Sequence, residues 1–371
     1  MIHKLLQTME SRRLDLNDQP YADIMREVFG QELSEDESRK RYYGMVMMAD
    51  LLPVEVEPIR ISHLPESEKT LIRDERNLLR QLQREQARDE RYLEVLERSI
   101  KTLDPLPKVD CDRVGKVGKS IVIQLSDWHF GLKTENPWNV YNVEVFNERL
   151  ESILRGFYDL AHTIGPEEVF VLFQGDLISG NIKNTLRLQN QENIIGQIML
   201  VAEKISHILS EMEQRLEAKV HACFVCGNHE RVMRDKKDNL SAENYTTLIK
   251  WYVQGRLGET SVDMMDNSHG LDLHVFETQG QRIGVVHGDK DPLGKVVANV
   301  GTLTGSYPDI IFTAHRHHLT VEDLQKCRVI GNGSLVGMDD YSQSLRLNSY
   351  PSQNVVVVGG NKEITVKQVI A

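Results

Sequence analysis

The sequence predicts an α/β protein in which two mixed β-sheets pack as a sandwich and are flanked by helices. Two observations lead to this prediction. From residue 120 onward, short β-branched runs alternate with helical stretches, and the runs end in Gly, Asp, Asn or His, as they do in α/β domains. The last strand candidates follow one another without room for long crossover helices, so the second half is expected to contain antiparallel pairs.

The apolar patterns place the individual elements. Strands are expected at residues 120–126, 168–174, 220–226, 271–276, 281–287, 309–313, 327–330, 354–358 and 364–370. Helices are expected where apolar side chains recur every three or four positions, at residues 145–164, 194–216 and 242–253.

Residues 1–64 are expected to form a small helical domain that contains a helix-turn-helix. Gly30 follows one helical pattern, and Ser34 begins the capping box of the next. The second helix starts with Arg39, Lys40 and Arg41, where a recognition helix would contact DNA. A solvated helical face explains three basic residues equally well.

Residues 65–104 are predicted to form a long charged helix or connector that leads to a catalytic domain at residues 105–371. Leucine and isoleucine recur with heptad-like spacing near the end of this stretch, and the pattern breaks at residues 83–91. Such a helix can pair with a second copy of itself through residues 66–103, which would give a homodimer, or it can connect parts of one chain.

Composition limits the classes of function. The formal net charge of −11 argues against a protein that coats nucleic acid or an anionic membrane, although a local basic groove stays open. No apolar run is long enough to cross a membrane and the first residues lack a secretory leader, so no membrane partner and a cytoplasmic location are expected. Cys223 and Cys226 are interpreted as buried strand residues and not as a redox pair.

Residue types that bind metal ions follow five of the expected strands. They lie in the motifs Asp127-Trp128-His129, Gly175-Asp176, Gly227-Asn228-His229-Glu230, His287-Gly288-Asp289 and Ala314-His315-Arg316-His317-His318. Each motif alone has an ordinary structural explanation, such as a turn. Together and in this order, the five motifs indicate a shared metal site.

The order of these motifs resembles that of the calcineurin-like metallophosphoesterases, over about residues 119 to 340. The resemblance implies a two-sheet sandwich fold and a site for two divalent cations. The ligands that it implies are Asp127, His129 and His317 for one ion, Asn228, His287 and His315 for the other, and Asp176 as a bridge between both. Ala314 stands where the family usually has Gly, and a small backbone adjustment is expected there.

The resemblance also implies a mechanism. Carboxylate, amide and imidazole ligands suit first-row divalent cations; manganese is the first expectation, with magnesium, iron, zinc and nickel as alternatives. A metal-bridging hydroxide would then hydrolyse a phosphoester. His229 matches a non-ligand histidine that neutralises or protonates the leaving oxygen, and Glu230 is expected to orient it. Arg231 and His318 are candidate contacts to substrate phosphate, although surface or packing roles fit them as well.

Finer resemblances bear on the substrate. Residues 127–131 and 175–177 are similar to the nuclease subunits of double-strand-break repair complexes, and the helical N-terminal part with residues 331–337 resembles phage and prophage metallophosphoesterases that carry a helix-turn-helix. Hydrolysis of DNA is therefore the leading hypothesis. A small-molecule or nucleotide phosphodiesterase or phosphatase is the alternative, and a DNA-binding protein with a vestigial site is the third.

Overall fold

The computed structural model describes residues 102–108, 118–240, 242–258 and 260–371, together with single positions between residues 73 and 100. The chain divides into two compact units, Met1–Glu90 and Arg91–Ala371. The predicted helix-turn-helix, with the basic residues 39–41, lies outside the described residues. Most of the segment predicted to pair two chains, residues 66–103, also lies outside them. The domain boundaries at residues 64 and 104 stay predictions.

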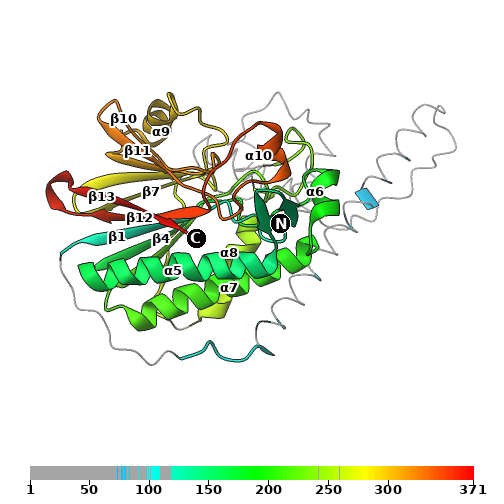
Figure 1. Cartoon of the computed structure of the whole chain (residues 1–371), viewed down its shortest axis with the longest axis horizontal. Coiled ribbons are helices and arrows are strands. Elements are labelled where there is room, and N and C mark those ends of the chain that lie inside the picture. The colour runs from blue at the N-terminus through cyan, green and yellow to red at the C-terminus, as the bar shows by residue number, and fades with distance from the viewer. Residues whose placement is uncertain are drawn as a thin grey trace, which may run out of the picture. The chain divides into compact units, whose positions relative to one another are not determined.

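Two mixed β-sheets form the centre of the second unit, as the sequence predicts (Figure 1). The first sheet has the spatial order β13 (Ile364–Ile370), β12 (Ser352–Val358), β1 (Ser120–Leu125), β4 (Glu168–Phe173), β5 (Lys219–Phe224) and β6 (Asp263–Met264). The second has the order β10 (Thr320–Leu324), β11 (Cys327–Gly331), β9 (Ile310–Thr313), β8 (Gln281–Val286) and β7 (Leu273–Thr278).

Both sheets combine parallel and antiparallel pairs. β1, β4, β5 and β6 run parallel, whereas β12 pairs antiparallel with β1 and with β13. In the second sheet β8, β9 and β11 run parallel, and β7 and β10 are antiparallel edge strands. The antiparallel pairs occur mostly late in the chain, where the sequence leaves no room for crossover helices.

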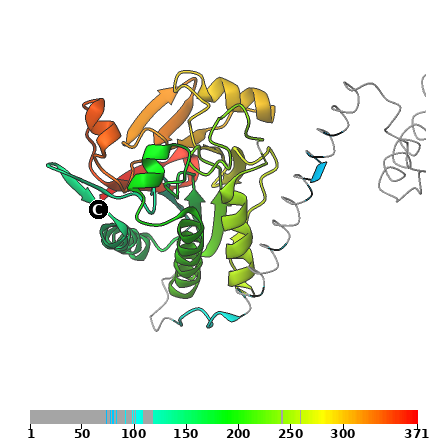
Figure 2. The same cartoon turned by 90° about the vertical axis from the view of Figure 1, so that its right-hand side faces the viewer.

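Helices cover the outer faces of both sheets (Figures 1 and 2). Three of them, α5 (Val143–Ile164), α7 (Ile194–Arg215) and α8 (Tyr245–Leu257), pack their apolar faces against the first sheet. The outer face of the second sheet packs against α9 (Val296–Thr304). Between the sheets, alternate strand residues such as Phe170, Phe276 and Phe312 form a separate apolar core.

Asparagine caps fix where the three long helices begin. The side chain of Asn142 accepts a hydrogen bond from the N–H of Val145 at the start of α5. Asn193 and Asn244 cap α7 and α8 in the same way. The cap at Asn244 explains why α8 begins at residue 245 and not at the expected residue 242.

Several short elements in the described part of the chain are not among those expected from the sequence. These are β2 (Thr134–Asn136), β3 (Asn139–Tyr141), β6, β10, α6 (Asn184–Gln189), α9, α10 (Asp340–Ser344) and the 3₁₀ turn η2 (Gly360–Lys362). Most of these elements have only two to six residues, too few for a hydrophobic period to appear. The nine residues of α9 are mainly Val, Thr and Gly, which are weak helix formers. β7 begins two residues later than predicted.

Two sequence-based expectations about the whole chain can be compared with the structure. Cys223 and Cys226 are buried free thiols, and burial raises the pKa of each, so the pair is not poised for redox chemistry. In the part of the chain that the structure describes, no helix is both long enough and apolar enough to span a membrane.

Helix α5 approaches the first sheet so closely at Gly156 that a side chain there does not fit. A Cβ on Gly156 would lie 2.6 Å from Cγ1 of Val369 in β13. We therefore expect Gly156→Ala to lower the free energy of unfolding by about 1–3 kcal/mol despite the higher helix propensity of alanine. Gly255 in α8 is the matched control, because a Cβ there would lie 3.7 Å from Ile100, an ordinary contact. Chemical denaturation should show Gly255→Ala unchanged or stabilised by about 0.5–1 kcal/mol; equal effects of the two substitutions would contradict the close approach.

Candidate metal centre

The loops that carry the predicted ligands leave both sheets at one edge of the sandwich. Because β1, β4 and β5 are parallel neighbours, Asp127, Asp176 and Asn228 emerge together after their carboxyl ends. β8 and β9 are parallel in the second sheet and lead to His287 and His315. This edge is where open α/β sheets place their binding sites.

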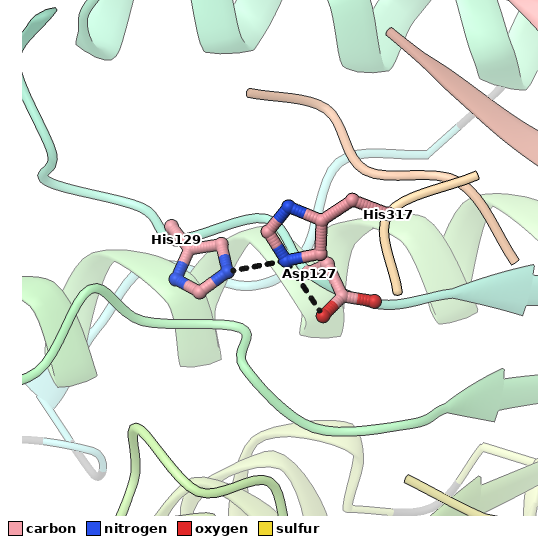
Figure 3. Close-up of side chains that lie close together, drawn as sticks. All are labelled: Asp127, His129 and His317. Carbon is pink, nitrogen blue, oxygen red and sulfur yellow. Dashed lines mark hydrogen bonds and ion pairs between the residues drawn. The ribbon is translucent and has the colours of Figure 1, made fainter. Parts of the chain in front are cut away.

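The first cluster of the site contains Asp127, His129 and His317 (Figure 3). His317 Nε2 lies 3.2 Å from His129 Nε2 and 3.4 Å from Asp127 Oδ1. Asp127 and His129 follow β1 of the first sheet, whereas His317 follows β9 of the second. The cluster therefore exists only when the two sheets are packed together.

The second cluster contains Asp176, His287 and His315, with Asn228 beside them. His287 Nε2 lies 3.3 Å from Asp176 Oδ2 and 3.3 Å from Asn228 Oδ1. The same Oδ2 of Asp176 lies 3.9 Å from His129 Nε2 in the first cluster. The structure thus brings all seven predicted ligands together, and Asp176 is placed between the two clusters.

These distances fit ligands of shared cations. Two ligand atoms that are each about 2.1 Å from one ion lie roughly 3.0–3.4 Å apart at common coordination angles. The His129–His317, His317–Asp127, His287–Asp176 and His287–Asn228 separations, 3.2, 3.4, 3.3 and 3.3 Å, agree with this range.

A buried oxygen without a hydrogen bond supports the same conclusion. Oδ1 of Asp127 is completely buried and receives no hydrogen bond, and the nearest group that can carry positive charge is the His317 ring, with Nε2 3.4 Å away. Such an atom is costly unless a cation neutralises it. The donor set of carboxylates, imidazoles and an amide therefore fits a pair of divalent ions, without selecting among the metals.

The electrostatics of the site favour positive charge. Burial alone would raise the pKa of Asp176, but His287 and His229 hold it well below its usual value. Burial likewise works against a charged His287, yet Asp176 and Asp127 raise the pKa of His287 to about 10. The pKa of His317 is also raised, by Asp127 against the effect of burial. The metal-free site therefore holds a proton on His287 that a cation would displace.

His129 behaves differently from these two histidines. Burial, and then the neighbouring His229, lower the pKa of His129 to about 3. Burial also lowers the pKa of His315. Both rings are thus neutral at pH 7, which is the form that binds a metal ion.

Five of the seven predicted ligands have a left-handed backbone. Their φ angles are 50° at Asp127, 43° at His129, 51° at Asp176, 69° at His315 and 61° at His317. This conformation costs an L-residue of the order of 1 kcal/mol or more and persists only where the surroundings enforce it. Its concentration in these loops indicates that the positions of the side chains, and not local stability, determine the loop conformation.

Gly227 and Glu230 hold the loop after β5 against the loop after β4. A Cβ on Gly227 would lie 2.3 Å from both the N and Oδ1 of Asp176, so only glycine allows this approach. The Glu230 carboxylate accepts hydrogen bonds from the N–H groups of Gly227, Asp176 and Leu177, at 3.1, 2.9 and 2.5 Å. Burial, and then Asp176, raise the pKa of Glu230 to about 8, while these N–H donors favour the carboxylate.

The contacts of Glu230 correct the expectation that it orients His229. The Nδ1–H of His229 instead donates to the carbonyl of Ser179, 2.8 Å away, if Nδ1 carries the proton. Nε2 of His229 is then free to face the site, where its ring lies 4.5 Å from that of His129. His129, Asp176 and His229 also lie close enough to share an ion. Glu230 is therefore a positioning residue for Asp176.

Polar groups behind the ligands set their orientation, and the sequence analysis did not single them out. The carbonyl of Gln174 accepts a hydrogen bond from Nδ1 of His287 at 2.7 Å, which leaves Nε2 for a metal ion. Ser126 donates to Oδ2 of Asp127, and Ser334 donates to its carbonyl, both at 2.7 Å. A polar residue at the end of an otherwise apolar strand, as at Ser126 and Gln174, is the sequence feature that could have indicated these supporting groups.

A buried network of amide side chains joins the two sheets beneath the site. Gln124 donates to Gln174 at 2.8 Å and receives a hydrogen bond from Asn354 at 3.1 Å. Asn332 continues the network to Ser126 at 2.8 Å. All five residues are completely buried. Such a network stiffens the ends of the strands from which the ligands emerge.

The predicted phosphate contacts lie at the margin of the site. The Arg231 guanidinium donates to the carbonyl of Asn228 at 3.1 Å and to carbonyls of its own loop. It lines a cavity of about 160 Å³ that also borders Asn228, Lys236 and Lys290. His318 is exposed, and its Nδ1 is 2.7 Å from a neighbouring carbonyl. Contact of either residue with a substrate stays a prediction.

Ala314 replaces the expected glycine without strain. Its φ is not among the positive values, so the residue does not need the freedom of glycine. The N–H of Ala314 donates to the carbonyl of His287 at 2.8 Å and keeps the two loops of the second sheet together.

No family model matches the chain. A protein derived from the SPbeta prophage of Bacillus subtilis strain 168, the uncharacterized protein YonJ, is 21% identical over 254 residues, which are 66% of this chain and 62% of YonJ. The chain therefore spans less than two thirds of the length of this distant relative.

Several solved structures resemble the chain at low identity. An archaeal phosphodiesterase matches with a TM-score of 0.33 and 15% identity, covering 67% of this chain and 99% of its own. Vps29 of Entamoeba histolytica in complex with Zn²⁺ matches with a TM-score of 0.30 and 16% identity, covering 67% and 98%. Because these scores are low, the fold is defined by its own sheet order and register. That order consists of two mixed sheets flanked by helices, with clusters of His and Asp side chains at the carboxyl edge.

Metal affinity should rise with pH. The pKa of His287 is raised to about 10 in the folded, metal-free protein, from about 6.5 in an unfolded chain. Its protonation therefore stabilises the metal-free fold below about pH 6.5, and this stabilisation is lost as the pH rises toward 10. A metal ion must displace this proton, so each displaced proton should strengthen binding about tenfold per pH unit. Titration calorimetry with Mn²⁺ at pH 6, 7 and 8 checks this, and a pH-independent affinity would contradict it.

His229→Ala should separate chemistry from metal binding. If His229 is an acid at the leaving oxygen, the variant should keep both metal ions while turnover falls about 10²–10⁴-fold. Metal content by mass spectrometry and turnover of a chromogenic diester measure the two effects. Loss of one ion from the variant would instead make His229 a ligand, as its place beside His129 and Asp176 allows.

Proposed function

We propose that this chain is a phosphodiester hydrolase that requires two divalent metal ions, manganese first, and that DNA is its substrate. The observation that carries the proposal is the position of Asp176, whose Oδ2 lies within 3.9 Å of His129 and 3.3 Å of His287. A carboxylate between two clusters of imidazoles, whose ligands come from both sheets, has the geometry of a bridging ligand.

The residues of the site divide the work of such a reaction. A bound metal pair would polarise the phosphoryl group, activate water and stabilise charge on the attacking and leaving oxygens. One ion would be held by Asp127, His129 and His317, the other by Asn228, His287 and His315, with Asp176 shared. His229 would place a proton from Nε2 near the leaving oxygen, and Glu230 would keep Asp176 in position.

DNA as the substrate is supported by sequence and not by a contact. The loops after β1 and β4 are similar to those of double-strand-break repair nucleases, and a prophage protein is a distant relative. Contacts from Arg39, Lys40 and Arg41 to DNA, and pairing of two chains through residues 66–103, belong to the same proposal.

A small-molecule or nucleotide phosphodiesterase is the competing function. The net charge of −11 disfavours binding of a long polyanion to the protein surface outside the site. The cavity of about 160 Å³ beside Asn228, with Arg231, Lys236 and Lys290 in its lining, would suit a small anionic group. Electrophoresis of single- and double-stranded DNA after incubation with enzyme and Mn²⁺, beside a panel of nucleotides, distinguishes the two functions.

Asp176→Ala tests the proposed activity. We expect the wild-type chain to hydrolyse bis(p-nitrophenyl) phosphate with Mn²⁺, and the variant to lose more than about a hundredfold of that rate, because even residues behind metal ligands typically contribute about 10–100-fold. Asp323→Ala is the matched control, since this exposed carboxylate pairs only with Arg328 among the described residues and lies on edge strand β10.

Two outcomes would contradict the proposal in different ways. Absence of Mn²⁺-dependent hydrolysis by the wild-type chain would favour a vestigial site. Full activity or two normally bound ions in Asp176→Ala, measured by calorimetry, would remove the bridging role.

A further inference from the structure

We propose that three short elements beside the metal centre form a stacking surface for the unpaired bases of single-stranded nucleic acid. These elements are the β2–β3 hairpin, α6 and α10 with the loop that follows it, and we call them the aromatic rim. The inference rests on the proposed function, because it names the substrate class of the same site. It concerns residues to which the sequence analysis gave no role.

The elements of the rim follow the ligand-bearing loops closely along the chain. β2 begins five residues after His129, and α6 begins eight residues after Asp176. The segment that leads to α10 passes directly behind the first cluster, because the N–H of Leu335 donates to the carbonyl of Asp127 at 3.3 Å. In Figure 2 the hairpin and α10 lie on the same side of the sandwich, with α6 beside them. A polymer bound at the metals would therefore meet the rim next.

Hydrogen bonds connect the three elements of the aromatic rim. The Asp340 carboxylate of α10 accepts from Thr134 in the hairpin at 3.2 Å and from Gln189 in α6 at 3.0 Å. Asn136 and Asn139 of the hairpin both donate to the carbonyl of Met338, at 3.1 and 2.9 Å. The backbone segments that carry the projecting side chains are thus held together before a ligand arrives, which reduces the entropic cost of binding.

Exposed aromatic rings project from the aromatic rim. Trp138 at the tip of the hairpin is 60% exposed, Tyr341 of α10 is 64% exposed and Tyr350 is 73% exposed. Tyr and Trp are enriched at binding surfaces, so three largely exposed rings in one hydrogen-bonded group of segments point to a ligand. Stacking on flat rings is how proteins hold unpaired bases without reading their sequence.

The charges of the rim favour an anionic polymer over a protein partner. The exposed cations of these segments are Lys133, Lys183, Arg187 and Arg346. Lys183 also lies 5.1 Å from the centre of the Tyr341 ring. The acidic residues of the same segments are Glu135, Asp339 and Asp340; the last two accept hydrogen bonds from neutral groups of the rim and keep their negative charge. Four cations against three carboxylates give this surface a net charge of +1, in a chain of net charge −11.

Exposed leucines are the feature that a protein interface would explain instead. Leu188, Leu345 and Leu347 are 79, 51 and 60% exposed in the same segments. Pairing between two copies of the chain through this surface is therefore an explicit outcome of the test.

The test uses the full chain and a fluorescein-labelled, mixed-sequence single-stranded DNA of about 20 nucleotides, with the same strand annealed to its complement as the duplex. Binding is followed by anisotropy without added metal, and hydrolysis of bis(p-nitrophenyl) phosphate with Mn²⁺ is measured on the same samples. The double variant Trp138→Ala, Tyr341→Ala should weaken single-strand binding roughly 5- to 100-fold and leave hydrolysis of the small diester unchanged.

Conservative and matched variants separate stacking from folding. Trp138→Phe with Tyr341→Phe keeps the rings and should bind nearly as the wild-type chain does. Tyr307→Ala removes a ring that is 63% exposed but lies just before β9, at the strand end opposite to the ligands, and should change nothing.

The outcomes distinguish the two proposals. Unchanged single-strand binding by the double alanine variant, equal loss with Tyr307→Ala, preference for the duplex, or dissociation of a dimer in size-exclusion chromatography would each overturn the rim as a base-stacking surface. Rim-dependent binding without hydrolysis of any diester would support the rim and refute the proposed activity alone.

Discussion

The site depends on one buried carboxylate that both sheets share. Asp176 follows β4 of the first sheet, and its Oδ2 lies near His129 on one side and near His287, from the second sheet, on the other. Its backbone is left-handed, its amide is held by Glu230, and its side chain fits only because Gly227 has no Cβ. Loss of any of these supports would move the one residue that connects the two clusters.

Packing of the two sheets against each other brings the ligand loops together. Parallel neighbours deliver ligands at the same edge within each sheet, but the two clusters also need the sheets to be in register with each other. The buried amides of Gln124, Gln174 and Asn354 provide that register, since they join strands of the first sheet to the ends of strands in the second. Packing of the apolar core thus stabilises the left-handed backbone of the ligand loops and the close approach of buried charged groups.

Much of this arrangement could be predicted from the sequence. Apolar runs such as those of β1 and β4 are visible in the sequence, and metal-binding residue types shortly after them locate the ligand loops. The role of Glu230 could not be predicted, because its partners are backbone N–H groups of another loop. The left-handed φ values and the tautomer-setting carbonyls of Gln174 and Ser179 leave no signal in residue type. The β2–β3 hairpin and α10 are too short to show a period, so the rim that they build beside the metals was invisible as well.

The central claim is that two cations share Asp176. Anomalous diffraction from crystals of the full chain soaked in Mn²⁺ tests it most directly. The account predicts two anomalous peaks, one beside Asp127, His129 and His317 and the other beside Asn228, His287 and His315, with the Asp176 carboxylate in contact with both. A single peak, or two peaks of which only one touches Asp176, would contradict it.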